Sequence, residues 1–387
     1  MPTGPVPLPS IRSLHTMGLP DDLWLYRKEI SLEAQREMDP SDPRHKAVPL
    51  PFTSAYQLDG PNEGRDSFGY PSSVFKVVNR EDGHLYCIRR FDNTRVSFKI
   101  ARAVSERWTT AISLSGHTVV EHTGIVRFHS CFVANRALFF VYTYYPGART
   151  LFERFFNTNS GGGIPLPEPF VWSCITQLVS AIRTVHTAKL ACRSIQLNHI
   201  LCTSPDGGMG QIRLRMNCIG VVDTLEFETR KSLVGLQYHD MRDLGYVIMS
   251  LTTGTALSRV TDPVIMQGCD RYIAQNYSRE LYSLVMQLLN PASNPPTILE
   301  VCRSIAIHAF DEVDSTFVVA DTYESALASE YESGRALRLL LKMGFINERP
   351  EFLMNRRWTE SGDCYVLKLF RDYGMYLCFD ILSIWGE

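Results

Sequence analysis

The chain has 387 residues, of which 45% are apolar and 21% are charged, and its formal net charge is −2. This near-neutral charge gives no global signal for binding nucleic acid or an anionic membrane, and no apolar run approaches the roughly 18 residues of a membrane-spanning helix. The ten cysteines form no C-x-x-C pair, which argues against a structural zinc site and a disulfide framework. Because the N-terminus also lacks a signal-peptide pattern, we expect a cytoplasmic protein without a membrane contact.

We expect residues 1–49 to form a largely flexible N-terminal extension that contains one helix. The first 19 residues are rich in proline and small polar residues, a composition that favours disorder. The helix then runs to about Met38, with Asp21 as its N-cap and Pro40 as its stop signal.

The next part of the chain is rich in β-branched and aromatic residues. The runs Val74–Val78 and His84–Arg90 are joined by Asn79-Arg-Glu-Asp-Gly83, which predicts a β-hairpin. We expect a helix over Ser97–Ile112 and strands near Ile125–Phe132 and Leu138–Tyr144.

From Glu168 onward the pattern becomes helical. Apolar residues recur at spacings of three and four as far as Val185, which predicts a long amphipathic helix. A hairpin with the glycine-rich turn Pro205–Gly210 follows, and further helices are expected from about Asp240 to Ile307. A small β-rich lobe followed by a helical lobe is the bilobal plan of a protein kinase. We therefore expect an α+β, kinase-like domain over residues 50–308.

Motifs in the helical part support this plan. The segment His239–Gly254 is similar to the kinase helix D-x-W-S-L-G-x-x-x-x-E-L-x-T-G, and Glu280–Pro291 is similar to a closing kinase helix. The stretch His186–Leu201 has the frame of the catalytic loop, H-R-D-L-x-x-x-N. Arg193 keeps its place there, but Ser194 replaces the catalytic Asp and His199 replaces the metal-binding Asn.

The phosphate-binding elements of a kinase are also altered. In the glycine-rich loop only Gly69 remains and Pro71 removes a backbone donor, so we expect a plain hairpin turn. In the V-A-I-K strand, Arg89 replaces the Lys, and its guanidinium does not reproduce a point ammonium. Glu106 is the candidate helix residue to pair with Arg89, and a solvated surface Glu is the alternative.

At the D-F-G position the chain reads Asn217-Cys-Ile-Gly220, so Cys218 replaces the magnesium-binding Asp. A neutral thiol is a poor ligand for a hard cation. With Ser194 and His199 also changed, general-base catalysis and metal-assisted charge neutralisation are both lost. We predict a pseudokinase without catalytic residues. An active atypical kinase that uses Asp223 or Glu226 is the alternative.

Nucleotide binding requires fewer groups than catalysis. In kinases the hinge meets adenine, and here that segment comprises Thr143, Tyr144, Tyr145, Pro146, Gly147, Ala148, Arg149 and Thr150. Arg149 offers a charge for phosphate, and Asn198 and His199 would face the phosphates from the other lobe. The alternatives are ordinary linker packing by the hinge and a pocket filled by the protein's own Arg and Tyr side chains.

Beyond the kinase-like domain, the sequence predicts a dimerisation helix over residues 309–343. Val313, Ala320, Leu327, Gly334 and Leu341 are spaced by seven, which indicates a short two-stranded coiled coil that bends near Gly334. A single helix packed on its own kinase-like domain is the alternative.

Longer motifs identify a family. The segments Ser333–Phe352 and Trp358–Asp372 resemble the pseudokinase regulatory subunit of the poly(A)-nuclease (PAN) deadenylase, as do Ile182–Arg193 and Arg213–Val221. The resemblance extends from about Leu19 to Asp372. It implies that residues 344–387 form a shortened C-terminal knob, because the tail from Tyr373 does not resemble the family.

The resemblance also implies a function. Members bind ATP without phosphotransfer, dimerise through the coiled coil and recruit the catalytic exonuclease subunit to mRNA for poly(A) tail shortening. In the family the hinge and the V-A-I-K arginine touch ATP, which corresponds here to Thr143–Thr150 and Arg89. A requirement for magnesium stays open. The N-terminal region lacks the family's zinc-finger and poly(A)-binding-protein motifs, so we expect contact with that protein and with mRNA to be indirect.

Overall fold

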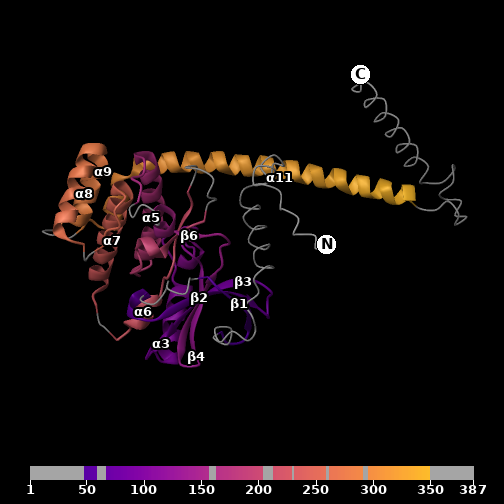
Figure 1. Ribbon diagram of the computed structural model, residues 1–387, viewed down its shortest axis with the longest axis horizontal. Coiled ribbons are helices and arrows are strands. Elements are labelled where there is room, and N and C mark those ends of the chain that lie inside the picture. Colours follow the sequence, from indigo (N-terminus) through magenta and orange to yellow (C-terminus); the bar gives the residue numbers. More distant parts are fainter. Residues whose placement is uncertain are drawn as a thin grey trace, which may run out of the picture. The chain divides into compact units, whose positions relative to one another are not determined.

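The structure is a computed structural model that describes residues 48–58, 67–156, 163–203, 212–228, 231–258, 261–290 and 295–348 (Figure 1). The chain divides into two compact units, one that ends at Thr316 and one that begins at Phe317. The helix expected over residues 21–38, the turn Pro205–Gly210 and the knob from residue 349 onward lie outside the described residues.

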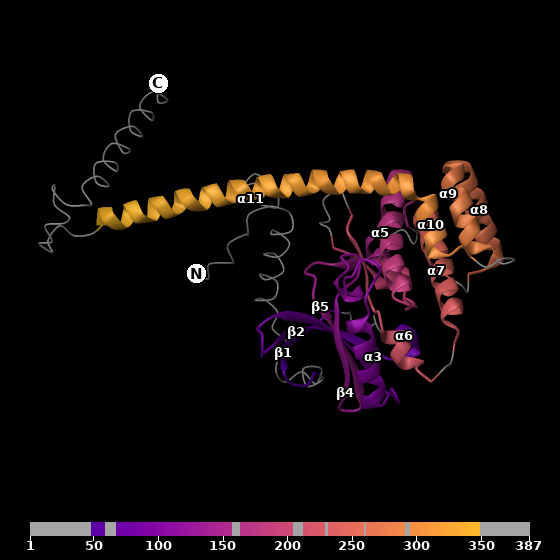
Figure 2. The same ribbon diagram turned by 180° about the vertical axis from the view of Figure 1, so that it is seen from behind.

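The β-rich lobe is a five-stranded antiparallel sheet (Figures 1 and 2). In the order β1-β2-β3-β5-β4, its strands are β1 (Phe52–Gln57), β2 (Ser72–Asn79), β3 (Leu85–Asp92), β5 (Ala137–Thr143) and β4 (Phe128–Ala134). The predicted hairpin is confirmed as β2 and β3, with Val74 opposite Arg89 and Val78 opposite Leu85.

The sequence pattern does not predict β1. The register of β1 against β2 shifts between Thr53 and Tyr56, and Ser54 has a φ of 50°. Such an irregularity breaks the alternation of polar and apolar residues by which a strand is recognised. The strand is stabilised by its pairing with β2, which is a tertiary contact.

Helix α3 (Phe98–Thr110) confirms the helix predicted over Ser97–Ile112, and it packs against the sheet. The Ser97 side chain caps it by accepting a hydrogen bond from the Ile100 amide at 3.4 Å. Its buried residues are Ala101, Val104 and Trp108, at spacings of three and four, so one stripe of the helix faces the core.

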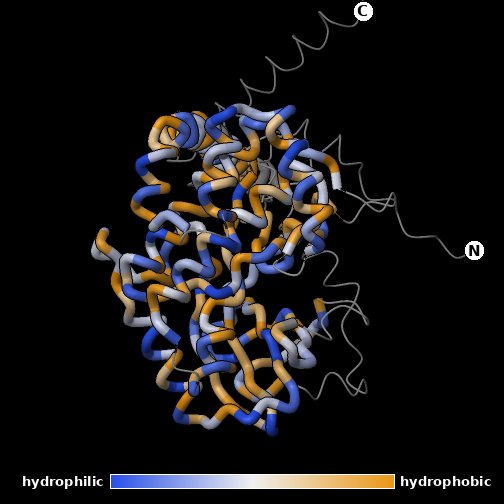
Figure 3. Tube along the Cα trace, turned by 90° about the vertical axis from the view of Figure 1, so that its left-hand side faces the viewer, coloured by the Kyte–Doolittle hydropathy of each residue, from blue (hydrophilic) through white to orange (hydrophobic). Residues whose placement is uncertain are grey.

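The helical lobe is built around α5 (Glu168–Thr187), which confirms the long helix predicted from Glu168. The other elements are α4 (Leu151–Phe155), α6 (Val221–Leu225), α7 (Leu233–Thr253), α8 (Pro263–Asn276), α9 (Arg279–Leu289) and α10 (Ile298–Ser304). Polar and apolar residues are interspersed along the described chain (Figure 3), as expected for helices that each bury one face.

Short elements connect the two lobes. A three-stranded sheet contains β6 (Arg149–Thr150), β7 (Ile200–Cys202) and β8 (Leu214–Met216), and β7 and β8 form the predicted hairpin. Within the described ranges, the short 3₁₀ helices are η2 (Ser67–Gly69), η3 (Val119–Glu121) and η4 (Leu197–His199).

One large apolar cluster runs from the α3 side of the sheet through the helical lobe, and a smaller one covers the other face of the sheet. The two lobes therefore share a core, which fixes the β3 and β5 side chains relative to the catalytic-loop segment.

Helix α11 (Ala306–Glu348) spans the boundary between the two units. Its first turns contact α5, where His308 stacks on Trp172 with ring centroids 3.8 Å apart and Glu312 accepts a hydrogen bond from Gln177 at 2.9 Å. The helical backbone continues through Gly334 without a break. Among the described residues, none of the helices combines the length and apolar character required to span a membrane.

Candidate functional site

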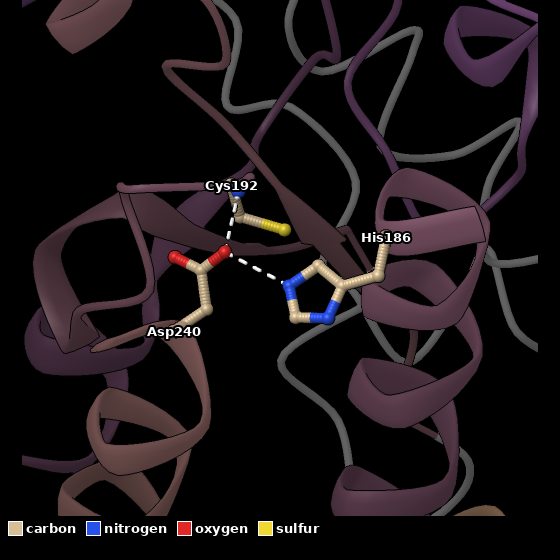
Figure 4. A group of neighbouring side chains, drawn as sticks. All are labelled: His186, Cys192 and Asp240. Carbon is tan, nitrogen blue, oxygen red and sulfur yellow. Dashed lines mark hydrogen bonds and ion pairs between the residues drawn. The ribbon is translucent and has the colours of Figure 1, made fainter. Parts of the chain in front are cut away.

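The catalytic-loop segment is anchored by a buried carboxylate. Asp240 on α7 accepts a hydrogen bond from the backbone amide of Cys192 at 2.7 Å and lies 2.9 Å from Nε2 of His186 (Figure 4). It also accepts a hydrogen bond from the backbone amide of Arg193 at 2.7 Å. Since Asp240 is fully buried, these donors replace the water that would otherwise solvate its charge. The loop therefore has a fixed backbone.

His186, Cys192 and Asp240 also form a group of metal-ligand type, but their chemistry does not fit a metal. Nε2 of His186 lies 2.9 Å from Oδ2 of Asp240, so a hydrogen bond between the two already occupies both of these ligand atoms. Burial and the charge of Asp240 raise the pKa of the Cys192 thiol, whereas a metal requires the thiolate. The group acts as a structural anchor.

Ser194, at the position of the catalytic base, has a structural role. It is almost completely buried, and its hydroxyl donates to the carbonyl of Asn217 at 3.0 Å. The neighbouring Asn198 is exposed, whereas His199 is buried. Asn198 and His199, which we expected to face the phosphates together, therefore differ in their exposure to solvent.

Four side chains lie near one another between the lobes, and we call them the inter-lobe site: Arg89 on β3, Tyr142 on β5, His199 on η4 and Cys218 next to β8. The charge of Arg89 acts on each of the other three. The Tyr142 hydroxyl donates to the carbonyl of Ile219 at 2.8 Å. Sequence reasoning missed Tyr142 because it looks like one more apolar strand residue.

Electrostatics keep the inter-lobe site cationic. Burial and the nearby Arg89 lower the pKa of His199 to about 3, so its imidazole is neutral at physiological pH. Burial raises the pKa of the Cys218 thiol, although Arg89 opposes this effect. Of the four side chains that define the site, one is a cationic guanidinium and none is a carboxylate, a set that suits an anion better than a divalent cation.

The expected pair between Arg89 and Glu106 does not form. Glu106 has 63% of its side chain exposed and pairs with Arg102 at 2.8 Å, while a guanidinium nitrogen of Arg89 lies 3.4 Å from the Ser72 hydroxyl. Glu106 lies outside the buried stripe formed by Ala101, Val104 and Trp108. The alternative, a solvated surface Glu, is therefore the one that the structure supports.

In the segment that corresponds to the glycine-rich loop, the structure describes residues from 67 onward, and these make contacts beyond those of a plain hairpin turn. The segment joins the antiparallel strands β1 and β2, but at its described end Phe68 turns inward. The Phe68 ring stacks on the His199 imidazole, with centroids 4.5 Å apart and an interplanar angle of 10°. Gly69 follows with a φ of 77°, a conformation that favours glycine.

The first half of the hinge segment is held by side-chain contacts. The Thr143 hydroxyl lies 2.9 Å from Nε2 of His129. Tyr144 has the ammonium of Lys76 5.4 Å from its ring centroid, and Tyr145 has the Arg215 guanidinium at 4.4 Å. These cation–π contacts agree with the alternative that the hinge tyrosines pack as an ordinary linker.

The second half of the hinge segment forms a turn and a cap. Pro146 leads into Gly147, whose φ is 65°, and the Ala148 amide donates to the carbonyl of Tyr145 at 3.3 Å. Arg149 is exposed on β6, and Thr150 caps α4 in a capping box with Glu153.

Two features escaped the sequence analysis. Lys76 is almost completely buried and also lies 5.2 Å from the Tyr56 ring centroid; its position inside the apolar run Val74–Val78 was the available signal. Asp223 accepts hydrogen bonds from the Trp108 indole and from Arg193, both at 3.0 Å. Through these two hydrogen bonds, Asp223 on α6 connects α3 with the catalytic-loop segment.

Comparisons with known proteins support the pseudokinase identification. Residues 298–380 match the family model described as the Pan3 C-terminal knob domain, so the match continues beyond Asp372, where we expected the resemblance to end. The chain is 37% identical over 356 residues to the PAN2-PAN3 deadenylation complex subunit pan3 of Dictyostelium discoideum, covering 89% of this chain and 45% of that protein. The chain thus spans about half the length of the curated relatives it matches.

Solved structures agree in fold. The Neurospora crassa PAN3 pseudokinase is 26% identical, with a TM-score of 0.73 and coverage of 92% of this chain and 83% of that one. A complex of Neurospora crassa PAN2 (WD40-CS1) with PAN3 (pseudokinase and C-term) gives a TM-score of 0.74 at the same identity, covering 92% of this chain and 84% of the matched chain. With its sequence, its fold and its C-terminal segment all alike, the chain belongs to the Pan3 family of pseudokinases.

Proposed function

We propose that this chain is a non-catalytic adaptor subunit of a PAN2-PAN3-type deadenylation complex, which recruits the exonuclease subunit to mRNA for poly(A) tail shortening. The observation that carries the proposal is the likeness, over 92% of this chain, to PAN3 in the complex with PAN2. The changed catalytic positions support it, because Ser194 and Cys218 are buried in structural roles. The adaptor works in the cytoplasm and reaches the poly(A)-binding protein and mRNA indirectly.

A reconstituted deadenylation reaction tests this function. The exonuclease subunit from the same organism is incubated with poly(A)-tailed RNA, with and without the purified chain. We expect tail shortening to be faster with the chain. Equal rates at saturating chain would contradict the adaptor function.

The adaptor also binds ATP without phosphotransfer. Support comes from the positive charge of Arg89, which lies near Tyr142, His199 and Cys218 between the lobes, and from the position of the Thr143–Thr150 segment directly after β5. Magnesium does not fit the residues present: His199 is buried and stacked, Cys218 is a neutral thiol and Ser194 donates its proton to a carbonyl. We therefore expect the nucleotide to bind without a protein-held metal.

Replacing Arg89 with Ala tests nucleotide binding. For the wild type at an ATP concentration a hundredfold above its dissociation constant, we expect about 2.7 kcal/mol of stabilisation, and the variant should lose most of it. Arg90→Ala is the matched control, because Arg90 lies on the opposite face of β3 and pairs with Asp92. A thermal shift with ATP that is equal in wild type and Arg89→Ala would contradict this role.

Homodimerisation through residues 309–343 completes the proposal. The apolar side chains of the predicted seam, which include Val313, Leu327 and Leu341, are exposed in the single chain. Burying such a stripe against a second copy is the usual way for a long helix to remove it from water.

A nucleotide-independent scaffold is the second candidate, and the stack of Phe68 on His199 favours it. The hypothesis of an active atypical kinase is not supported by the contacts of its proposed catalytic groups. Its proposed groups, Asp223 and Glu226, both form ion pairs with Arg193.

A further inference from the structure

Phe68 makes a contact that no general feature of the fold requires. Its ring lies flat on the His199 imidazole, at 4.5 Å between centroids, and meets Phe91 edge-on at 6.1 Å. His199 is only 6% exposed, so the stack closes off one face of that imidazole. Ring pairs in these two geometries attract each other beyond the effect of burial alone.

The backbone of Phe68 supports a specific role for this contact. Phe68 has a φ of 61° and a ψ of 21°, a left-handed conformation that bulky L-residues rarely adopt. Such a conformation persists when surrounding contacts over-determine it, and it is concentrated at functional sites. Here the contacts are those with His199 and Phe91.

The position of the Phe68–His199 contact in the kinase frame indicates which part of a nucleotide it would displace. In kinases the loop between the first two strands covers the nucleotide phosphates, and the last residue of the catalytic-loop motif holds a metal on them. Phe68 lies in that loop, in η2 before β2, and His199 occupies that last position. The Phe68–His199 pair therefore lies where the phosphates of a kinase ligand would lie, with Arg89 beside it.

We propose that the Phe68–His199 pair is an internal plug that occupies the phosphate part of the nucleotide site and competes with the triphosphate, while it leaves the adenosine part free. This inference rests on the proposed nucleotide binding. The plug weakens ATP relative to adenosine, so it sets how strongly the protein responds to the phosphates. The site then has two states, one with ATP bound and one in which the Phe68–His199 pair occupies the phosphate part.

Isothermal titration of the full chain with ATP and with adenosine, both without magnesium, tests the plug. In Phe68→Ala the ring is removed, and we expect ATP to bind about three- to tenfold more tightly, with the affinity for adenosine unchanged. Phe98→Ala is the matched control, because Phe98 is 61% exposed at the start of α3; it should change neither affinity. Phe68→Leu removes the stack with less loss of volume and serves if the Ala variant does not fold.

His199→Asn supplies an independent check. It removes the other ring, so it should also strengthen ATP binding, and the double variant should gain little more because both changes break one contact. Unchanged or weaker ATP binding in a folded Phe68→Ala or Phe68→Leu protein would overturn the plug, provided that adenosine still binds. If neither ligand binds to the wild type or to any variant, nucleotide binding itself is refuted, and the plug with it.

Discussion

At the scale of single residues, each lost kinase group has become part of the protein's framework. Ser194 ties the catalytic-loop segment to Asn217, His199 stacks under Phe68, and Cys218 is buried beside Arg89. In these roles the side chains are uncharged and buried away from water, whereas catalysis requires charged or metal-bound groups at the same positions. The residue types alone predicted a pseudokinase, and the solved pseudokinase of Neurospora crassa PAN3 confirms this class of fold. The sequence did not predict the new contacts, which depend on partners far along the chain.

His199 makes the stability of the protein depend on pH. Its pKa is about 3 in the folded protein and about 6.5 in an unfolded chain. Between these values the unfolded state binds the proton and the folded state does not, so the stability contributed by this group is complete above about pH 6.5 and falls as the pH decreases. From pH 7 to pH 5 we expect a loss of about 2 kcal/mol in the free energy of unfolding.

Urea unfolding at the two pH values measures this loss. In His199→Asn the titrating group is absent, so the difference between pH 7 and pH 5 should shrink by about 2 kcal/mol. An equal pH dependence in both proteins would show that His199 is not a buried neutral imidazole.

At the scale of elements, the sequence predicted what periodicity determines. The α5 helix, the β2–β3 hairpin and α3 appear where their patterns place them. The β1 strand could not be predicted from the sequence, because a shift in register interrupts the alternation of polar and apolar residues. Nor does the sequence contain a signal for the hydrogen bond between Trp108 and Asp223, which lie 115 positions apart.

The contact of Asp223 with Arg193 and Trp108 should stabilise the join between α3, α6 and the catalytic-loop segment. The side chains of Arg193 and Asp223 are only 12% and 14% exposed, so Asp223→Asn should lower the free energy of unfolding by about 1–3 kcal/mol. Glu106→Gln is the contrasting variant, because the Glu106 pair with Arg102 is solvent-exposed and such pairs contribute little. Equal stability of Asp223→Asn and wild type in denaturant titrations would refute this role.

Helix α11 carries the prediction about assembly. Its seam residues Leu327 and Leu341 are 71% and 64% exposed in one chain, and a charge at both positions should prevent pairing with a second copy. Light scattering should give twice 43.9 kDa for the wild type and 43.9 kDa for the Leu327→Glu/Leu341→Glu variant. Ala328→Glu, one position off the seam, should remain a dimer. A wild type that is monomeric at micromolar concentration would contradict the coiled coil.

At the scale of the whole molecule, the order of the elements predicted the fold, and the C-terminal motifs predicted the family. Both are confirmed, by the solved pseudokinase structures and by the knob model over residues 298–380. The partner was beyond what residue patterns alone determine, because recognition of another protein depends on shape and surface rather than on periodicity. It rests on the likeness to PAN3 in its complex with PAN2.

The central claim, that the chain is an adaptor for the exonuclease, is tested most directly by complex formation. The purified chain and the PAN2 subunit of the same organism are mixed and analysed by size-exclusion chromatography with light scattering. We predict a single co-eluting species whose mass is the sum of a dimer of this chain and the exonuclease subunit. Separate elution of the two proteins, with the dimer of this chain intact, would contradict the claim.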